Sequence, residues 1–349
     1  MRAAVVFEHG DFERIRFEER EVPAVGAGEV RVRIVAAGVN HLDTWVRRGV
    51  PGHRFPLPLV LGSDGAGVID AVGEGVLDRR PGEEVVVFPG ASCGVCSACA
   101  TGEDNLCRHY AILGESRDGT CADYVVVPAA NVAPKPKRLG FAEAASFSLA
   151  FLTAWNMLVR RAELRAGESV LIHAGGSGVG SAAVQIASLF GARVIATAGN
   201  AAKCDRARAL GADDVIDTSS ADFLEEVRRL TGKRGVDVVF EHVGEATFDR
   251  SVKCLARGGR LVTCGATTGG AVGISLHQIF FKNLSILGST MGRRGDSWRI
   301  LELMGRGRLT PVVDAILPFE ELREAHRRLE AREVFGKIVV VLDPALAAR

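Results

Sequence analysis

Four cysteines lie close together in the run SCGVCSACATGEDNLC, which spans residues 92–107 of the chain. Cys93, Cys96, Cys99 and Cys107 follow the spacing C-x2-C-x2-C-x7-C, and four thiolates on one short loop suit a tetrahedral zinc ion. An iron–sulfur cluster is the alternative metal group, and free thiols or disulfides are the alternatives without a metal. Four protein ligands leave no position at zinc for water or substrate. We therefore expect one structural zinc per chain.

A glycine-rich turn is the second run with chemical meaning. It follows the strand-like run SVLIHA, precedes the helical run SAAVQIASLF, and consists of Gly175, Gly176, Ser177, Gly178, Val179 and Gly180. Such a turn lets the backbone approach a pyrophosphate closely and directs a helix N-terminus at its negative charge. Ser177 stands where the fingerprint usually has glycine, and its hydroxyl can donate to phosphate. The pattern predicts a dinucleotide site; the alternative is a helix-packing turn without a ligand.

The end of the next strand-like run, ARVIATA, bears on which dinucleotide binds. NAD-preferring sites place Asp or Glu there to hold the ribose hydroxyls, and this chain has Ala198. Asn200 and Lys203 follow and can receive a 2′-phosphate, although Lys203 could equally be a solvated lysine at a helix start. We expect NADP(H), with NAD as the alternative.

The surrounding sequence divides into two regions of different pattern. Residues 1 to about 130 alternate short strand-like runs with turns, whereas residues 151 to about 290 alternate strands with helices of roughly 10–12 residues. The second pattern predicts an α/β fold with a parallel sheet and right-handed crossovers. Two helical runs and a last strand, GKIVVVL, follow residue 290.

Composition limits the possible partners. The formal net charge of the 349-residue chain is +1, which argues against nucleic acid or an anionic membrane as a partner. No apolar run approaches the roughly 20 residues that span a bilayer, and the first run turns charged too early for a signal peptide. We expect a cytoplasmic protein.

Several runs, taken together, resemble the medium-chain dehydrogenase/reductase superfamily from end to end. They are GEVRVRIVAAGVNHLD, PLVLGSDGAGVIDAVG, GTCADYVVVP, FGKIVVVL, the cysteine run and the glycine-rich turn. The resemblance implies a GroES-like β-barrel catalytic domain over residues 1–150 and 290–349, a Rossmann domain over 151–289, and a substrate cleft between them. It also identifies residues 92–107 with the structural zinc lobe of the zinc alcohol dehydrogenase branch.

The sequence departs from that branch at its catalytic zinc. The resemblance places the three zinc ligands at Asn40, Ser63 and Leu149, and none of these residue types is a good zinc ligand. Leu42 replaces the hydroxyl that relays a proton. The run GVNHLD instead resembles the zinc-free quinone oxidoreductases and enone reductases.

Asn40, His41 and Asp64 are the candidate catalytic residues. Asn40 could donate an amide hydrogen bond to an oxygen on which negative charge develops, or could cap a turn. His41 could donate as imidazolium, contact the cofactor pyrophosphate or lie at the surface, and with Asp64 it could form an unusual metal site. Thr153, by resemblance, and His242, at the end of a strand, are expected beside the cofactor.

Three functions remain open at this point. The favoured one is transfer of hydride from NAD(P)H to a small carbonyl compound, either a quinone or an α,β-unsaturated carbonyl. The alternatives are an alcohol or carbonyl dehydrogenase and a non-catalytic dinucleotide-binding protein. The apolar run LSILGST, residues 284–290, predicts edge-to-edge strand pairing between copies, and hence a homodimer or homotetramer.

Overall fold

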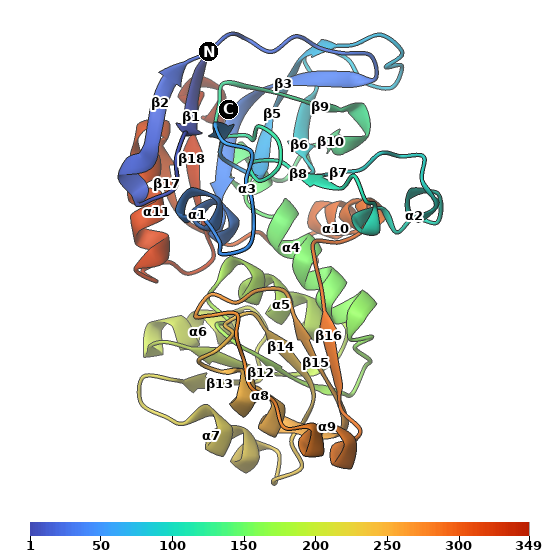
Figure 1. Cartoon of the computed structure of the whole chain (residues 1–349), viewed down its shortest axis with the longest axis vertical. Helices are drawn as coiled ribbons and strands as arrows, with labels where there is room; N and C mark the ends of the chain where they lie inside the picture. The colour runs from blue at the N-terminus through green and yellow to red at the C-terminus, as the bar shows by residue number, and fades with distance from the viewer. Residues whose placement is uncertain (349) are drawn as a thin grey trace. The chain divides into compact units, whose positions relative to one another are not determined.

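A computed structural model describes residues 1–348 of the chain (Figure 1). The chain forms two compact units, one made of Met1–Leu149 with the segment from Arg293 onward, and one made of Ala150–Gly292. No helix in the described part of the chain is both long enough and apolar enough to cross a bilayer.

The first unit is built on a sheet in the order β10-β6-β5-β3-β18-β17, with β9 also paired to β3. These strands are β3 (Glu29–Val39), β5 (Asp64–Val72), β6 (Glu84–Val87), β9 (Tyr124–Pro128), β10 (Val132–Pro134), β17 (Val313–Pro318) and β18 (Lys337–Val341). Smaller sheets pair β1 (Arg2–Val6) with β2 (Ile15–Glu19) and β4 (Leu59–Val60), and β7 (Gly90–Ala91) with β8 (Ala111–Ile112). The helices are α1 (His41–Arg48), α2 (Ser97–Ala100), α3 (Phe141–Ala144), α10 (Arg294–Gly305), α11 (Leu322–Glu330) and α12 (Pro344–Ala347).

Strand β3 is the centre of this unit. Its first half alternates buried and half-buried residues, while its second half, VAAGV, is buried throughout. The alternation means that one face of the strand remains partly solvated, and the continuous burial means that the end of the strand is covered on both faces. The strand therefore delivers its last residues into the interior of the unit.

The second unit contains a parallel sheet in the order β13-β12-β11-β14-β15-β16, with helices on both faces (Figure 1). Its strands are β11 (Ser169–Ile172), β12 (Arg193–Ala198), β13 (Asp214–Asp217), β14 (Val236–Glu241), β15 (Leu255–Thr263) and β16 (Ser285–Gly288). The helix α4 (Ser148–Trp155) leads into it, and α5 (Gly178–Leu189), α6 (Ala201–Ala209), α7 (Phe223–Leu230), α8 (Phe248–Cys254) and α9 (Leu276–Lys282) follow. This strand order is that of the doubly wound dinucleotide-binding fold, which confirms the expected α/β class with a Rossmann unit.

Candidate functional site

The four cysteine sulfurs converge as their spacing predicts, with all four Sγ atoms within 4.8 Å of one another. The Sγ–Sγ distances are 3.9 Å between Cys93 and Cys99, 3.6 Å between Cys96 and Cys99, and 3.5 Å between Cys107 and Cys93. Sulfurs placed tetrahedrally at ~2.3 Å from a zinc ion would be ~3.8 Å apart. The distances fit that geometry and exceed the ~2.0 Å of a disulfide bond. Within residues 1–348, this is the only group of three or more His, Cys, Asp or Glu side chains arranged to hold a metal ion.

Backbone N–H groups favour the thiolate form of Cys93. Those of Val95 and Cys96 hold the pKa of the Cys93 thiol at about 6, and the N–H of His109 donates to Cys107 Sγ at 3.4 Å. Thiolates are the form of cysteine that binds metals.

The segment after the third cysteine attaches the lobe to helix α10 (Figure 1). The buried carboxylate of Asp104 accepts the backbone N–H of Arg294, the first residue of α10, at 3.0 and 3.2 Å. Glu103 pairs with Arg293 at 2.5 Å. A carboxylate at a helix N-terminus is favourable because it meets the positive end of the helix dipole. A metal in the lobe would therefore fix a loop that anchors this helix.

The strand register brings a second polar cluster together. Strand β3 ends at Val39, β5 begins at Asp64 and β18 begins at Lys337. Because β3 is antiparallel to both neighbours, its carboxyl end lies beside their amino ends, with Gly38 opposite Asp64 and Val39 opposite Ile338. Asn40, the residue after β3, therefore meets Asp64 and Lys337.

These three side chains form a buried hydrogen-bonded group. The Lys337 ammonium donates to Asp64 Oδ2 at 2.9 Å and to Asn40 Oδ1. The Asn40 amide donates to Asp64 Oδ2 at 3.1 Å and to the Gly38 carbonyl oxygen at 3.4 Å. The side chains of Asp64 and Lys337 are 0% and 5% exposed. The group thus holds a carboxylate and an ammonium away from water.

All three positions that the resemblance assigns to zinc ligands lie around Asp64. Asn40 donates to one carboxylate oxygen, the backbone N–H of Leu149 donates to the other at 2.7 Å, and Ser63 precedes Asp64 in the chain. The buried hydroxyl oxygens of Ser63 and Ser148 have no hydrogen-bond partner in the described structure. No metal-ligand group of three or more residues in the described chain includes His41 or Asp64.

Asp43 completes the charges around this cluster. Its carboxylate accepts the backbone N–H groups of Asn40 at 2.7 Å and Gly62 at 3.1 Å. Burial raises the pKa of Asp43 to about 6, while the nearby charge of Lys337 opposes the rise.

The Asn40 amide has acceptors within the protein, and its expected role as a donor to substrate remains a prediction. Both hydrogens of its amide are engaged, one by Asp64 and one by Gly38. His41 begins helix α1 and is partly exposed. Sequence reasoning did not identify Lys337. A signal was present, because this lysine directly precedes the apolar run IVVVL. A lysine buried with such a strand needs a hydrogen-bonded or charged partner.

The glycine-rich turn has the close contacts that a dinucleotide site requires. The Ser177 hydroxyl caps helix α5 by accepting the N–H of Gly180 at 2.9 Å. A Cβ atom at Gly180 would lie 2.2 Å from the Ala174 carbonyl oxygen, and one at Gly175 would lie 3.1 Å from Ala196 Cβ. Only glycine fits at Gly180, and the backbone of the turn and the free N–H groups at the start of a 12-residue helix fit a pyrophosphate.

The pairing of β12 with β13 places a carboxylate beside the end of β12, although this acid is distant from Ala198 in the sequence. Ala198 lies opposite Asp217 of the neighbouring strand β13. Asp217 accepts the N–H and hydroxyl of Ser219 at 2.9 and 2.6 Å, and these bonds lower its pKa. Asn200 caps helix α6 by accepting the backbone N–H of Lys203 at 2.9 Å. The Asn200 side-chain oxygen is thus already bonded, and its amide nitrogen is a hydrogen-bond donor.

A buried network joins the carboxyl ends of β11 and β14. The fully buried Glu241 carboxylate accepts the hydroxyls of Ser251 at 2.8 Å and Thr247 at 2.9 Å, and the N–H groups of the two residues that begin the next turn at 2.6 and 3.1 Å. His173 Nε2 lies 2.8 Å from the Ser251 hydroxyl. His242 Nε2 donates to the His173 carbonyl oxygen at 2.9 Å.

Two residues expected beside the cofactor, His242 and Thr153, lie in the second unit. The His242 Nε2 atom holds strand ends together, and Thr153 is buried in α4. Their contact with a dinucleotide remains a prediction.

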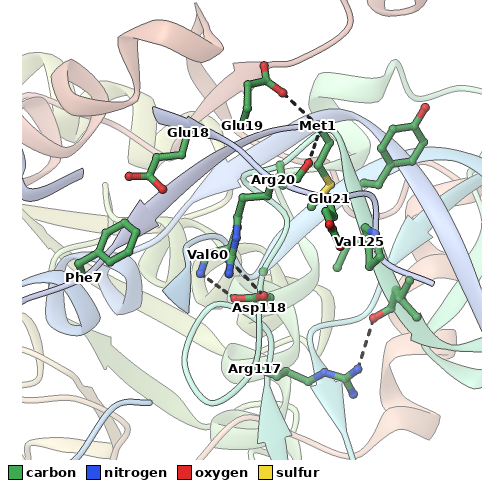
Figure 2. A pocket seen from close by; sticks show the side chains of 15 residues that line it. Met1, Phe7, Glu18, Glu19, Arg20, Glu21, Val60, Arg117, Asp118 and Val125 are labelled. Carbon is green, nitrogen blue, oxygen red and sulfur yellow. Dashed lines mark hydrogen bonds and ion pairs between the residues drawn. The ribbon is translucent and has the colours of Figure 1, made fainter. Parts of the chain in front are cut away.

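The first unit also has a pocket of about 650 Å³ beside its N-terminus (Figure 2). Two ion pairs lie along its lining: the amino group of Met1 lies 3.3 Å from Glu19, and Arg20 lies 3.6 Å from Asp118. None of the residues predicted to form a site lines it.

Comparison with known proteins adds to this geometry. The alcohol dehydrogenase GroES-like domain family matches residues 26–137, and the zinc-binding dehydrogenase family matches residues 178–306. An NAD-dependent alcohol dehydrogenase of Sulfolobus acidocaldarius is 35% identical, with 97% of this chain and 99% of the relative covered. A quinone oxidoreductase of Rattus norvegicus is 30% identical, with 98% of each covered. A crystal structure of an NAD-dependent alcohol dehydrogenase is 52% identical, with a TM-score of 0.94 and with 98% of this chain and 100% of that chain covered.

Proposed function

Because the chain belongs to the medium-chain dehydrogenase/reductase superfamily and is an NAD(P)-dependent oxidoreductase, we propose that it reduces a quinone or an α,β-unsaturated carbonyl compound with NADPH. One observation carries the proposal. Asn40, Ser63 and Leu149 stand where the resemblance places zinc ligands, and they surround the Lys337–Asp64 ion pair instead.

Oxidation of an alcohol and reduction of a conjugated carbonyl require different groups from the protein. Alcohol oxidation in the zinc branch uses the metal to form an alkoxide and a hydroxyl to remove the proton. Leu42 provides no hydroxyl here. A conjugated carbonyl accepts hydride directly and needs only a donor at its oxygen. The residues present therefore favour reduction of a conjugated carbonyl.

An alcohol or carbonyl dehydrogenase is the second candidate. It is favoured by the names of two relatives, one of them 52% identical over 98% of this chain. The deciding experiment measures both directions on one preparation: NADPH consumption with quinones and enones, and NAD(P)+ reduction with primary alcohols. Faster turnover of the alcohols would reject the proposal in favour of this second candidate.

We propose NADPH as the preferred cofactor. With Ala198 where an acid would repel a 2′-phosphate, charged hydrogen bonds from the Asn200–Lys203 turn should contribute about 1–3 kcal/mol, or roughly 5- to 150-fold in affinity. Ala198→Asp should reverse the preference. Dissociation constants for NADPH and NADH, measured by titration of nicotinamide fluorescence, provide the check.

A neighbouring acid supplies the matched control for that experiment. Asp217 lies opposite Ala198 but is engaged by Ser219, so Asp217→Asn should change the preference less than Ala198→Asp does. Equal affinity of the wild-type protein for the two cofactors would contradict the assignment.

We also propose a homodimer or a dimer of dimers, assembled through the edge strand β16. The strand ends the six-stranded sheet, and apolar side chains are exposed on it and on the preceding helix α9: Leu276, Phe280, Phe281 and Ile286. Light scattering should give two or four times the chain mass of 37.0 kDa. Phe281→Glu should lower that mass, whereas Leu77→Glu, at an exposed site in the other unit, should not. A wild-type monomer at micromolar concentration would contradict the assembly.

A further inference from the structure

We propose that the ammonium group of Lys337 supplies the positive charge that polarises the substrate carbonyl, at the residues that replace the zinc ligands. The inference deepens the proposed function and rests on it in one respect, namely that the substrate is a carbonyl compound.

The hydrogen bonds of Lys337 leave it able to donate once more. An ammonium group has three hydrogens, and the described structure gives it two acceptors, Asp64 Oδ2 and Asn40 Oδ1. These two acceptors fix the position of the nitrogen atom, because Asp64 is itself held by Asn40 and by the backbone N–H of Leu149. The remaining hydrogen belongs to a preorganised donor, which is the arrangement that stabilises a developing oxyanion.

Two buried hydroxyls lie next in the chain to residues that bond within or to this cluster. The hydroxyl oxygens of Ser63 and Ser148 are buried without a partner, and these residues directly precede Asp64 and Leu149 in the chain. Buried polar groups in folded proteins nearly always have a partner, so these two hydroxyls point to a missing polar partner.

The charges explain why a lysine, rather than a metal, suits these residues. Asp64 is fully buried, and Lys337 is the cation bonded to it. A zinc ion placed among Asn40, Ser63 and Leu149 would find an amide, a hydroxyl and an aliphatic side chain, and it would have to displace the ammonium from Asp64. The ammonium is therefore the resident cation of this cluster.

The reaction balances without a metal. The reduced cofactor supplies a hydride when bound. An enone that gains hydride at its β-carbon moves the electrons of its double bond toward oxygen, and the resulting enolate oxygen accepts a hydrogen bond from Lys337. A proton from water then adds at the α-carbon, so that one hydride and one proton are added across the double bond and Lys337 keeps its protons throughout.

The test compares two buried lysines. Lys337→Met should lower kcat for 2-cyclohexenone by about 100-fold or more while the affinity for NADPH stays unchanged. The loss should be smaller for 9,10-phenanthrenequinone, a stronger electrophile, whereas a merely structural defect would lower both rates alike. Lys135→Met is the matched control, because Lys135 is also nearly buried and ion-paired, with Glu84 at 3.1 Å, and should retain wild-type rates.

Two additions keep the test decisive. Should Lys337→Met fail to fold, the double variant Lys337→Met, Asp64→Asn leaves no carboxylate buried without a counter-ion and is expected to show the same selective loss. The metal content is measured on the wild-type protein. After incubation with excess zinc and desalting, it should hold about one zinc per chain. A second tightly bound zinc would overturn the inference.

The outcomes separate the inference from the proposed function. Variants at Lys337 that are as active as Lys135→Met overturn the role of Lys337 and leave enone reduction standing. A wild-type protein that oxidises alcohols and reduces no enone or quinone rejects the proposed function, and the same variants assayed on the alcohol then decide whether Lys337 acts on the carbonyl group. No turnover in either direction overturns both.

Discussion

Replacing Cys107 with serine is expected to remove the zinc from the chain and to lower its thermal midpoint by on the order of 5–10 °C. Cys107 is the most buried of the four cysteines, and its sulfur lies 3.5 Å from that of Cys93. Without the metal, the loop that carries Asp104 loses its fixed geometry, and with it the contact to the first N–H of α10. The cost therefore extends from the lobe to the helix that it anchors.

Elemental analysis and a thermal unfolding curve measure this pair of effects. Cys204→Ser is the control, since Cys204 is equally buried but lies in α6, away from the lobe, and should leave the zinc content at about one per chain. The catalytic rate per folded chain should survive in Cys107→Ser, because four protein thiolates leave zinc no open position. Complete loss of turnover in a folded, zinc-free variant would show that the metal does more than hold the loop.

The second large effect is expected at Glu241. Glu241→Ala should destabilise the protein by about 3–5 kcal/mol, because it leaves two hydroxyls and two backbone N–H groups buried without their acceptor. The loss would loosen the ends of β11 and β14, since His173 reaches Glu241 through Ser251.

Urea unfolding measures the free energy of unfolding of Glu241→Ala, and a variant of a neighbouring acid is the control. Glu245 lies in the same turn but is exposed, so Glu245→Ala should change the free energy of unfolding by no more than about 0.5 kcal/mol. Glu241→Gln, which keeps one acceptor oxygen, should fall between the two. A midpoint for Glu241→Ala equal to that of the wild type would mean that the network contributes nothing to stability.

Features that depend on neighbouring residues could be predicted from the sequence. The alternation of strands and helices after residue 150 gave the parallel sheet, and the cysteine spacing indicated the cluster whose sulfurs meet within 4.8 Å. The glycine-rich turn is similarly local, since the close contact at Gly180 is made to Ala174 and Ser177 within a few residues of it. Short-range patterns of this kind survive folding because the turn geometry itself selects the residue types.

Features that depend on strand register could not be predicted in this way. Lys337 meets Asn40 only because β18 pairs with β3 in one register, and Asp217 lies beside Ala198 only because β13 pairs with β12. A shift by one residue would turn each side chain to the opposite face of its sheet. The same limit applies to Asn40, because its partners Asp64 and Lys337 are distant in the chain and could not be assigned to it from the sequence.

The first unit is formed by two segments of the chain that are synthesised at different times. Lys337 follows Asn40 by 297 positions, and the whole second unit, Ala150–Gly292, is synthesised between them. On the ribosome the second unit can fold as a continuous piece. The edge of β3 that pairs with β18 stays unpaired until β18 has been synthesised. An incomplete chain that ends before residue 337 leaves this edge unpaired and Asp64 without its ammonium, which makes it a substrate for chaperones and proteases. The last strand to be translated thus completes both the sheet and the charge balance of the candidate site.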